Sequence, residues 1–382
     1  MTRFFLFYLL IYGGMNLYVG ARLSVLTRKW APWGHVGLAL FLLGMIAGPI
    51  VSRLLERTAL VWLAQIIGLV TYTWMALALW FFFLGVAIDL WNLLVRGASA
   101  WAWKGASVLR VGAVQGLMFM GVMIGLATIW GTVEAQYLHV RTVTMKSSRL
   151  PVGSPPIRIV QVSDIHLGLI EREGRVRQIL RIVERLEPDM VVSTGDVVDG
   201  TAHHMDRVVR LWAGCRPPLG KYAILGNHEF YAGLQRSLGL LSEAGFQVLR
   251  GSAAAPDPRL LVAGVDDPAG LRRTPKLLAD ENALLPPPGA ARPFTLFLKH
   301  RPWIEQSSLG RFDLQLSGHT HSGQVFPFGL VVRMQYPFLH GFFDLGEGSA
   351  LYVSRGTGTW GPRLRLAAPP EVTLITIAPA GS

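Results

Sequence analysis

The sequence contains little cysteine and little charge. Cys215 is the only cysteine among 382 residues, so an intramolecular disulfide and a thiolate metal cluster are both excluded. Charged residues make up 16% of the chain and hydrophobic residues 51%. The formal net charge is +12, yet no basic run interleaved with aromatic residues occurs, which argues against nucleic-acid binding. This composition indicates that part of the chain lies in a membrane.

Long uncharged stretches are concentrated in the first third of the chain, at residues 4–21, 36–51, 58–88 and 111–133. A bilayer core about 30 Å thick needs about 20 helical residues, so these stretches predict about four transmembrane helices. We expect the first to be retained, because no clear signal-peptide cleavage site follows it. The second is shortest and contains Pro49, which leaves a buried or re-entrant helix as an alternative. The third predicts one long tilted helix.

Lysine and arginine residues flank these stretches on both predicted sides of the membrane. The densest loop carries Arg22, Arg28 and Lys29. Placing it in the cytoplasm leaves both termini, and the C-terminal part of the chain, outside. We therefore predict a multi-pass protein of the cell membrane with its C-terminal domain on the outer face. A basic surface there would attract anionic membrane lipids.

The remainder of the chain alternates patterns typical of strands and helices. Residues 137–145 alternate as a strand would, and a segment rich in proline and glycine follows. We place the boundary here, with a membrane domain at 1–135 and a second domain at 136–382. Helices are predicted at 176–186, 205–212 and 234–244. The pattern indicates an α/β fold of layered sheets and helices.

Five short polar motifs each follow an apolar run that predicts a strand. In chain order they are Asp164-Ile165-His166, Gly195-Asp196, Gly226-Asn227-His228-Glu229, His300 and Gly318-His319-Thr320-His321. Open α/β sheets bind ligands where strands end. Carboxylate, imidazole and amide donors suit Mn²⁺, Zn²⁺ or Fe²⁺ and do not select among them. Together the motifs supply enough ligands for two divalent metal ions.

Each motif has an ordinary structural interpretation when it is taken alone. If Asp164 and His166 lie in an extended segment, both side chains project to one side and can reach one ion. An isolated Asp-x-His is more often a turn aspartate beside an exposed histidine. Asp196 could equally cap a helix. The occurrence of all five motifs in this order favours the metal site.

The order of motifs resembles that of the calcineurin-like metallophosphoesterases. Residues 160–168 and 351–358 resemble sequence motifs of the membrane-associated bacterial branch of this family. The resemblance covers about residues 137–382. It implies a four-layer α/β/β/α sandwich that follows the N-terminal transmembrane helices. It also implies a phosphoric ester hydrolase in which two metal ions activate water. One ion would be held by Asp164, His166, Asp196 and His321, and the second by Asp196, Asn227, His300 and His319.

The resemblance also suggests roles for residues beside these ligands. His228 is the candidate catalytic residue, which stabilises the transition state or protonates the leaving oxygen, and Glu229 either holds its ring or is a spectator. Ser322 replaces a glycine of the branch, and a different local backbone is expected there because serine tolerates positive φ less readily. Arg355 and Arg363 could bind phosphate, although structural ion pairing is the preferred interpretation for both.

The predicted function is a membrane-anchored di-metal phosphohydrolase that cleaves a phosphoester or pyrophosphate, with a lipid or cell-envelope molecule as the expected substrate. The motifs do not separate phosphodiesterase, monoesterase and pyrophosphatase activity. A nucleotide-linked glycolipid is one specific candidate substrate. It would require the catalytic domain to lie in the cytoplasm, which conflicts with the predicted orientation. The alternative is a non-catalytic membrane receptor or scaffold, which predicts the loss of a ligand or of His228. The oligomeric state is not indicated.

Overall fold

The computed structural model describes residues 6–28, 32–101, 104–170, 173–201, 205–272, 280–289 and 291–380. The chain forms two compact units. One comprises Met1–Val133 with Gly361–Leu364, and the other comprises Glu134–Trp360 with Arg365–Ser382. Each unit has its own hydrophobic core, which includes Val19 and Leu42 in the first and Ile159 and Leu296 in the second.

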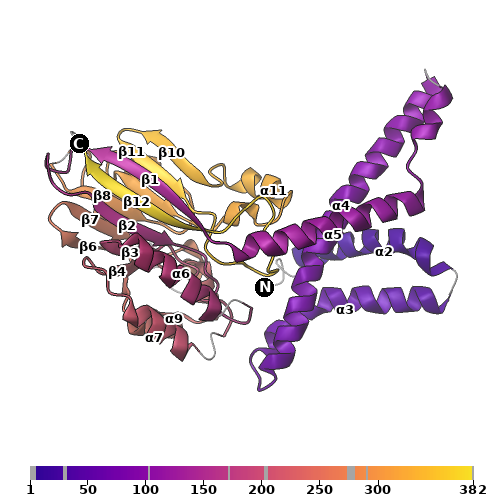
Figure 1. Cartoon of the computed structure of the whole chain (residues 1–382), viewed down its shortest axis with the longest axis horizontal. Coiled ribbons are helices and arrows are strands. Elements are labelled where there is room, and N and C mark those ends of the chain that lie inside the picture. The colour runs from indigo at the N-terminus through magenta and orange to yellow at the C-terminus, as the bar shows by residue number, and fades with distance from the viewer. Residues whose placement is uncertain are drawn as a thin grey trace. The chain divides into compact units, whose positions relative to one another are not determined.

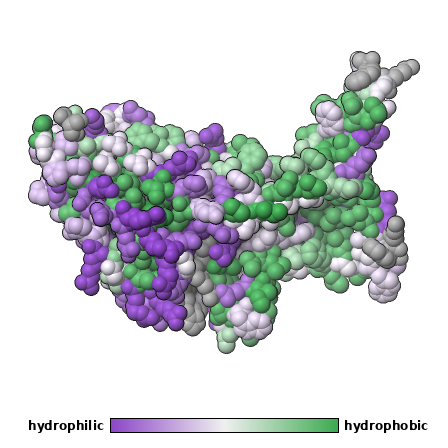
Figure 2. Space-filling model, in the orientation of Figure 1, coloured by the Kyte–Doolittle hydropathy of each residue, from purple (hydrophilic) through white to green (hydrophobic). Residues whose placement is uncertain are grey.

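The first unit is helical. Its elements, with the helix that leads into the second unit, are η1 (Leu9–Gly13), α2 (Gly14–Thr27), α3 (Trp33–Leu55), α4 (Val61–Trp101), η3 (Lys104–Leu109) and α5 (Ala113–Gln136). Within the described ranges, four helical stretches are long and apolar enough to cross a membrane, namely Leu6–Thr27, Trp33–Leu55, Val61–Trp101 and Ala113–Gln136. Figure 2 shows broad hydrophobic surface over these helices. The prediction of four apolar helices is confirmed.

Helices α3 and α4 show how the second and third apolar stretches fold. α3 runs through Pro49 as one helix of 23 residues, which is enough to cross a bilayer. α4 is a single helix of 41 residues, so the prediction of one long helix is confirmed. Its end at Trp101 lies well beyond the predicted end at residue 88, because helical backbone continues past the uncharged stretch.

The second unit contains two six-stranded sheets. The first has the order β1-β12-β2-β3-β4-β5, formed by β1 (His139–Ser147), β12 (Glu371–Pro379), β2 (Ile157–Val162), β3 (Met190–Ser193), β4 (Lys221–Ala223) and β5 (Gln247–Val248). The second has the order β10-β11-β9-β8-β7-β6, formed by β10 (Gly341–Gly346), β11 (Ser349–Val353), β9 (Leu314–Ser317), β8 (Phe294–Leu298), β7 (Leu260–Gly264) and β6 (Ser252–Asp257).

Alternation along the strands explains how the sheets pack. On β2, Ile157 and Ile159 belong to the core between the two sheets, whereas Val160 and Val162 belong to the core under the helices. Successive side chains of a strand point to opposite faces, so β2, which carries buried apolar side chains on both faces, must be covered on both. β2, β3 and β4 are mutually parallel, as are β7, β8 and β9, so the carboxyl ends within each set lie at one edge of its sheet.

The outer layers of the sandwich are unequal. Helices α6 (Glu173–Leu186), α7 (Asp206–Gly214) and α9 (Leu234–Glu243) cover the first sheet (Figure 1). On the second sheet, Phe297 and Phe312 pack with Leu285, which follows the short helix α10 (Glu281–Leu284). The predicted α/β fold with mixed sheets is confirmed, and one helical layer is much thinner than the other among the described residues.

Candidate metal centre

Every motif lies directly after a strand, as predicted. Asp164 and His166 follow β2, Asp196 follows β3, and Asn227 follows β4 as the first residue of α8 (Asn227–Ala232). His300 follows β8 in the second sheet, and the His319 motif follows β9. The site therefore draws its side chains from the carboxyl ends of strands in both sheets, because parallel strands end at the same edge.

One cluster joins Asp164, His166 and His321, whose ligand atoms all lie within 4.8 Å of one another. The Nε2 atoms of His166 and His321 are 3.0 Å apart, and His321 Nε2 lies 3.5 Å from Asp164 Oδ1. All three residues are buried. Two imidazole nitrogens and a carboxylate thus converge on one point.

A second cluster joins Asp196, His300 and His319 within the same limit of 4.8 Å. His300 Nε2 lies 3.2 Å from Asp196 Oδ2 and 3.1 Å from His319 Nδ1. Asp196 Oδ2 also lies 3.9 Å from His166 Nε2, in the first cluster. Asp196 is therefore placed between the two groups.

Asn227 lies beside these clusters and carries an unusual buried atom. Its Oδ1 is buried and has no hydrogen-bond partner among the residues that the structure describes. An unsatisfied buried amide oxygen is costly, so such an atom calls for an explanation. A cation is the simplest one, because an amide oxygen is a good neutral ligand for hard divalent ions.

Hydrogen bonds select which ring nitrogen faces each cluster. His300 Nδ1 lies 2.8 Å from the carbonyl oxygen of Thr194, so Nδ1 carries the proton and Nε2 faces Asp196. His319 Nε2 lies 2.9 Å from the hydroxyl of Tyr336, which leaves Nδ1 facing His300. Such outer contacts orient metal-binding imidazoles. The sequence indicated no role for Tyr336, because its contact with His319 exists only in the folded chain.

The backbone at the site is strained. Asp164, His166, Asp196, His319 and His321 have φ of 52°, 52°, 53°, 72° and 49°. Residues other than glycine rarely adopt this region, and each such residue costs roughly 1–3 kcal/mol. The expectation that Asp164 and His166 lie in an extended segment is therefore wrong. Their side chains converge because both residues adopt the left-handed conformation.

Two motif glycines allow the carboxylates to approach the backbone. A Cβ atom at Gly226 would lie 2.1 Å from Asp196 Oδ1, and one at Gly318 would lie 2.2 Å from Asp164 Oδ2. Both distances are shorter than any real contact. Glycine at these positions is therefore required by the approach of the two aspartates, which explains its place in the motifs.

A buried chain of hydrogen bonds holds Asp164. Its Oδ2 accepts from the Ser163 hydroxyl at 2.5 Å, Ser163 accepts from Thr194 at 2.7 Å, and Thr194 accepts from Gln161 at 3.0 Å. The Gln161 amide also donates to the carbonyl oxygen of Ser317, on β9 of the other sheet. The network therefore ties both sheets to one carboxylate.

His228 is held by Asp199 and not by Glu229. Its Nδ1 lies 2.9 Å from Asp199 Oδ1, which leaves Nε2 as the ring nitrogen that can meet a substrate. Glu229 is fully buried and accepts backbone N–H groups of Asp196, Val198 and Gly226 at 2.8–3.0 Å. It fixes the two loops together. Glu229 therefore neither holds the His228 ring nor is a spectator, because it accepts hydrogen bonds from the backbone of both loops.

Electrostatics in the metal-free protein separate the histidines into two kinds. Burial lowers the pKa of His166 to about 3, and it lowers the pKa values of His319 and His321 well below the ordinary value. These rings are neutral, as metal ligands must be. Burial also disfavours the charge on His300, but the negative charge of Asp196 outweighs it and raises the His300 pKa to about 10.

His228 has a raised pKa for a similar reason. Burial opposes its charge, but the carboxylates of Asp196 and Asp199 raise its pKa to about 9. The ring therefore carries a proton at neutral pH in the metal-free protein. A protonated imidazole beside the two clusters can donate to a leaving oxygen.

The other residues noted in the sequence have definite places. Ser322 has φ of 55°, so serine adopts the left-handed conformation expected of the glycine it replaces, and its hydroxyl lies 2.8 Å from His340 Nδ1. Arg355 forms an ion pair with Glu371 at 2.7 Å, which agrees with a structural role. Arg363 is exposed. Arg365, which the sequence did not single out, is fully buried and donates to the carbonyl oxygens of His321 and Gly358.

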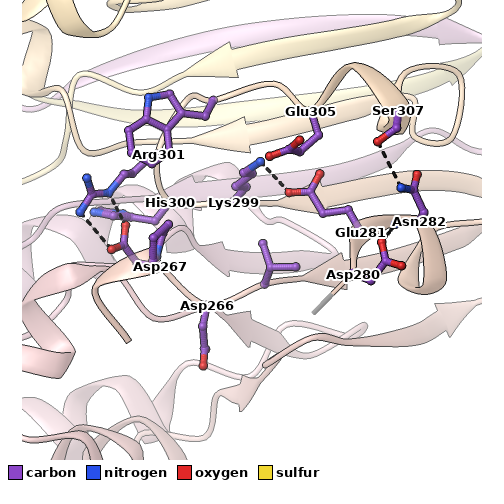
Figure 3. Close-up of a pocket in the computed structure, with 13 residues that line it drawn as sticks. Asp266, Asp267, Asp280, Glu281, Asn282, Lys299, His300, Arg301, Glu305 and Ser307 are labelled. Atoms are coloured by element: carbon purple, nitrogen blue, oxygen red, sulfur yellow. Dashed lines mark hydrogen bonds and ion pairs between the residues drawn. The ribbon is translucent and has the colours of Figure 1, made fainter. Parts of the chain in front are cut away.

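His300 also lines a pocket of about 230 Å³ (Figure 3). Figure 3 shows two ion pairs in its wall, Arg301 with Asp267 and Lys299 with Glu281. The Arg301 guanidinium also lies over the Trp303 ring, 5.0 Å from its centroid. The pocket therefore has a polar wall in which the main opposite charges are already paired.

Comparison with known proteins agrees with this geometry. Residues 157–323 match the family model of the calcineurin-like phosphoesterases. An uncharacterized metallophosphoesterase of Aquifex aeolicus is 40% identical over 266 residues, which cover 69% of this chain and 100% of that protein. A transmembrane protein with metallophosphoesterase domain of Danio rerio is 30% identical over 311 residues, which cover 78% and 70% of the two chains. The chain therefore belongs to the calcineurin-like phosphoesterase family and is a metal-dependent phosphoester hydrolase that uses two metal ions.

Proposed function

We propose that this chain is a membrane-anchored phosphohydrolase whose two ions share Asp196. The assignment follows the two clusters and adds Asn227 to the second. One ion would be held by Asp164, His166, Asp196 and His321, and the other by Asp196, Asn227, His300 and His319. The observation that carries it is the position of Asp196 between the clusters, within 3.9 Å of His166 and 3.2 Å of His300.

The proposed reaction divides between the two metal ions and the side chains beside them. Two bound divalent ions would lower the pKa of a water molecule and neutralise charge on the phosphoryl oxygens. His228, held by Asp199, would donate its proton from Nε2 to the leaving oxygen. Tyr231 and Trp360 have rings 5.5 and 6.0 Å from His228 and are 62% and 49% exposed. They would form apolar walls beside the leaving group.

The substrate that we propose is a phosphoester or pyrophosphate of a lipid or cell-envelope molecule. α5 ends at Gln136 and the first strand of the second unit begins at His139, so almost no chain separates a helix of membrane-spanning length from the catalytic unit. A site tethered in this way meets lipid-borne phosphate more often than a freely diffusing enzyme does. The proposed domains are a multi-pass membrane domain at 1–135 and a catalytic domain at 136–382, with the latter on the outer face.

Hydrolysis by the full-length protein in detergent tests the activity. The protein is stripped of metal and titrated with Mn²⁺, using bis-p-nitrophenyl phosphate and p-nitrophenyl phosphate as diester and monoester probes. Metal-dependent turnover of either probe supports the proposal and identifies the ester class. Two bound ions without turnover of either probe, or of extracted envelope lipids, would contradict a hydrolase and favour the receptor alternative.

Protease added to intact cells and to spheroplasts tests the orientation. Cleavage of the catalytic unit from outside is expected. Cleavage that appears only after the cells are lysed would reverse the orientation and would make a nucleotide-linked cytoplasmic substrate compatible with the site.

The hydroxyl of Tyr336 should increase the affinity of one metal site for its ion. Tyr336→Phe removes the partner of His319 Nε2 at 2.9 Å, so the ring loses the contact that orients it. We expect the affinity for one of the two ions to fall by about 10-fold or more, because such outer contacts typically contribute 10–100-fold. Calorimetric titration with Mn²⁺ measures this. Tyr352→Phe is the matched control, since its hydroxyl donates to Glu371 instead. Equal affinities in all three proteins would contradict the assignment of His319.

Metal affinity should rise with pH. His300 has its pKa raised to about 10, so it keeps a proton at neutral pH that Nε2 must lose before it can bind metal. Raising the pH removes this competing proton, and affinity for the ion should rise by about 10-fold per pH unit between about pH 6.5 and 8.5. Calorimetry in two buffers of different ionisation enthalpy should show about one proton released. Affinity independent of pH would show that metal binding displaces no proton from His300.

A further inference from the structure

Helix α11 (Phe328–Gln335) is an apolar helix with no buried residue. Met334 is 87% exposed, Leu330 61% and Val331 46%. A short helix in a water-soluble domain normally gains its stability by burying an apolar face. α11 leaves this face uncovered. Exposed apolar surface of this kind marks an interaction site.

The charge around α11 restricts what can cover this face. No aspartate or glutamate occurs between Asp313 and Asp344, and Arg333 is the only lysine or arginine in that interval. Phe326, just before the helix, is 56% exposed. A segment with exposed apolar side chains, one arginine and no acidic residue matches the surface of a bilayer with anionic head groups.

The N-terminal helices of the same chain would attach the catalytic unit to a bilayer. The described residues include four helices of membrane-spanning length, and the last of them ends at Gln136, just before β1 begins at His139. The catalytic unit is therefore confined near a membrane. We propose that α11 docks on this membrane, with Leu330 and Met334, four residues apart on one face, inserted between the lipids.

Docking would bring the segments on both sides of α11, which contribute to the metal centre, close to the lipid head groups. α11 begins shortly after His321, and it is followed directly by Tyr336, whose hydroxyl contacts His319. Figure 1 shows α11 outside the sheets, next to the start of β10 in the chain. The consequence for lipid substrates rests on the proposed function, whereas docking itself does not require turnover.

Quenching of a fluorophore on α11 tests the inference. Full-length protein with Cys215→Ser is reconstituted in nanodiscs of phosphatidylethanolamine and phosphatidylglycerol. An environment-sensitive fluorophore is attached at Met334→Cys and, in a second protein, at Leu330→Cys. Val152→Cys is the matched control, because Val152 is 83% exposed in the loop between β1 and β2. Lipids carrying a nitroxide on the acyl chain report insertion, and iodide reports exposure to water.

We expect the nitroxide to quench most of the fluorescence at positions 330 and 334 and iodide to quench little of it, with the reverse at position 152. Quenching by iodide alone at all three positions would overturn the inference. Protection from both quenchers at 330 and 334 would also overturn it, since protein and not lipid would then cover the helix. Because fluorescence does not depend on turnover, a failure here leaves the Mn²⁺-dependent assay as a separate test of the proposed function.

Discussion

Replacing Asp196 by asparagine is expected to abolish phosphoester hydrolysis and to reduce the amount of bound metal. Asp196 is the residue placed between both clusters, so one substitution weakens both ion sites. Asparagine keeps an oxygen that can accept the His228 backbone N–H, which Asp196 Oδ1 now accepts at 2.8 Å. The local fold should therefore survive. Metal binding should weaken because the substitution removes the negative charge that balances the two cations.

Turnover and metal content should be measured on the same purified sample, by the diester assay and by elemental analysis. Asp206→Asn is the matched control, because Asp206 is exposed in the first turn of α7 and belongs to neither cluster. The control should keep full activity and its full complement of metal. An Asp196→Asn protein with undiminished turnover would exclude the bridging role and, with it, the proposed arrangement of the two ions.

Replacing His228 by alanine is expected to lower turnover by about 10² to 10⁴ while both metal ions remain bound. The reason is that His228 is the proposed proton donor to the leaving oxygen and is not one of the proposed metal ligands. Asp199→Asn should cause a smaller loss, because it removes the group that holds the His228 ring and leaves the imidazole in place. The double variant should be no slower than His228→Ala, since the two residues act as one unit.

This cycle distinguishes a catalytic dyad from two independent contributions. Additive losses in the double variant would show that Asp199 acts apart from His228. A loss of metal in His228→Ala equal to its loss of turnover would make His228 a ligand. His139→Ala is a suitable control, because His139 is an exposed histidine of β1 in the same unit. It should leave both quantities unchanged.

Much of the site could be predicted because its requirements are local. A metal ligand must be a carboxylate, an imidazole or an amide, and a ligand at the carboxyl end of a parallel strand must follow an apolar run. The Asp164, Asp196, Asn227, His300 and His319 motifs meet both conditions within a few residues of chain. The four apolar helices were predictable for a similar reason, since length and hydropathy are properties of a single segment.

Other features depended on contacts between distant segments. Tyr336 reaches His319 only because α11 returns the chain to the site, and no residue type near it indicates this. Asp199, and not Glu229, holds the His228 ring because of how the loop after β3 turns. The thin outer layer over the second sheet and the end of α4 at Trp101 were equally beyond prediction from composition.

The sequence by itself determined the types and order of the candidate ligands, the strands that precede them and the apolar helices, because each of these is decided by neighbouring residues. Only the tertiary structure decided how the side chains converge. Asp164, His166 and Asp196 adopt the left-handed conformation, which an isolated chain avoids. They keep it because both sheets and the buried network from Gln161 to Asp164 compensate the strain.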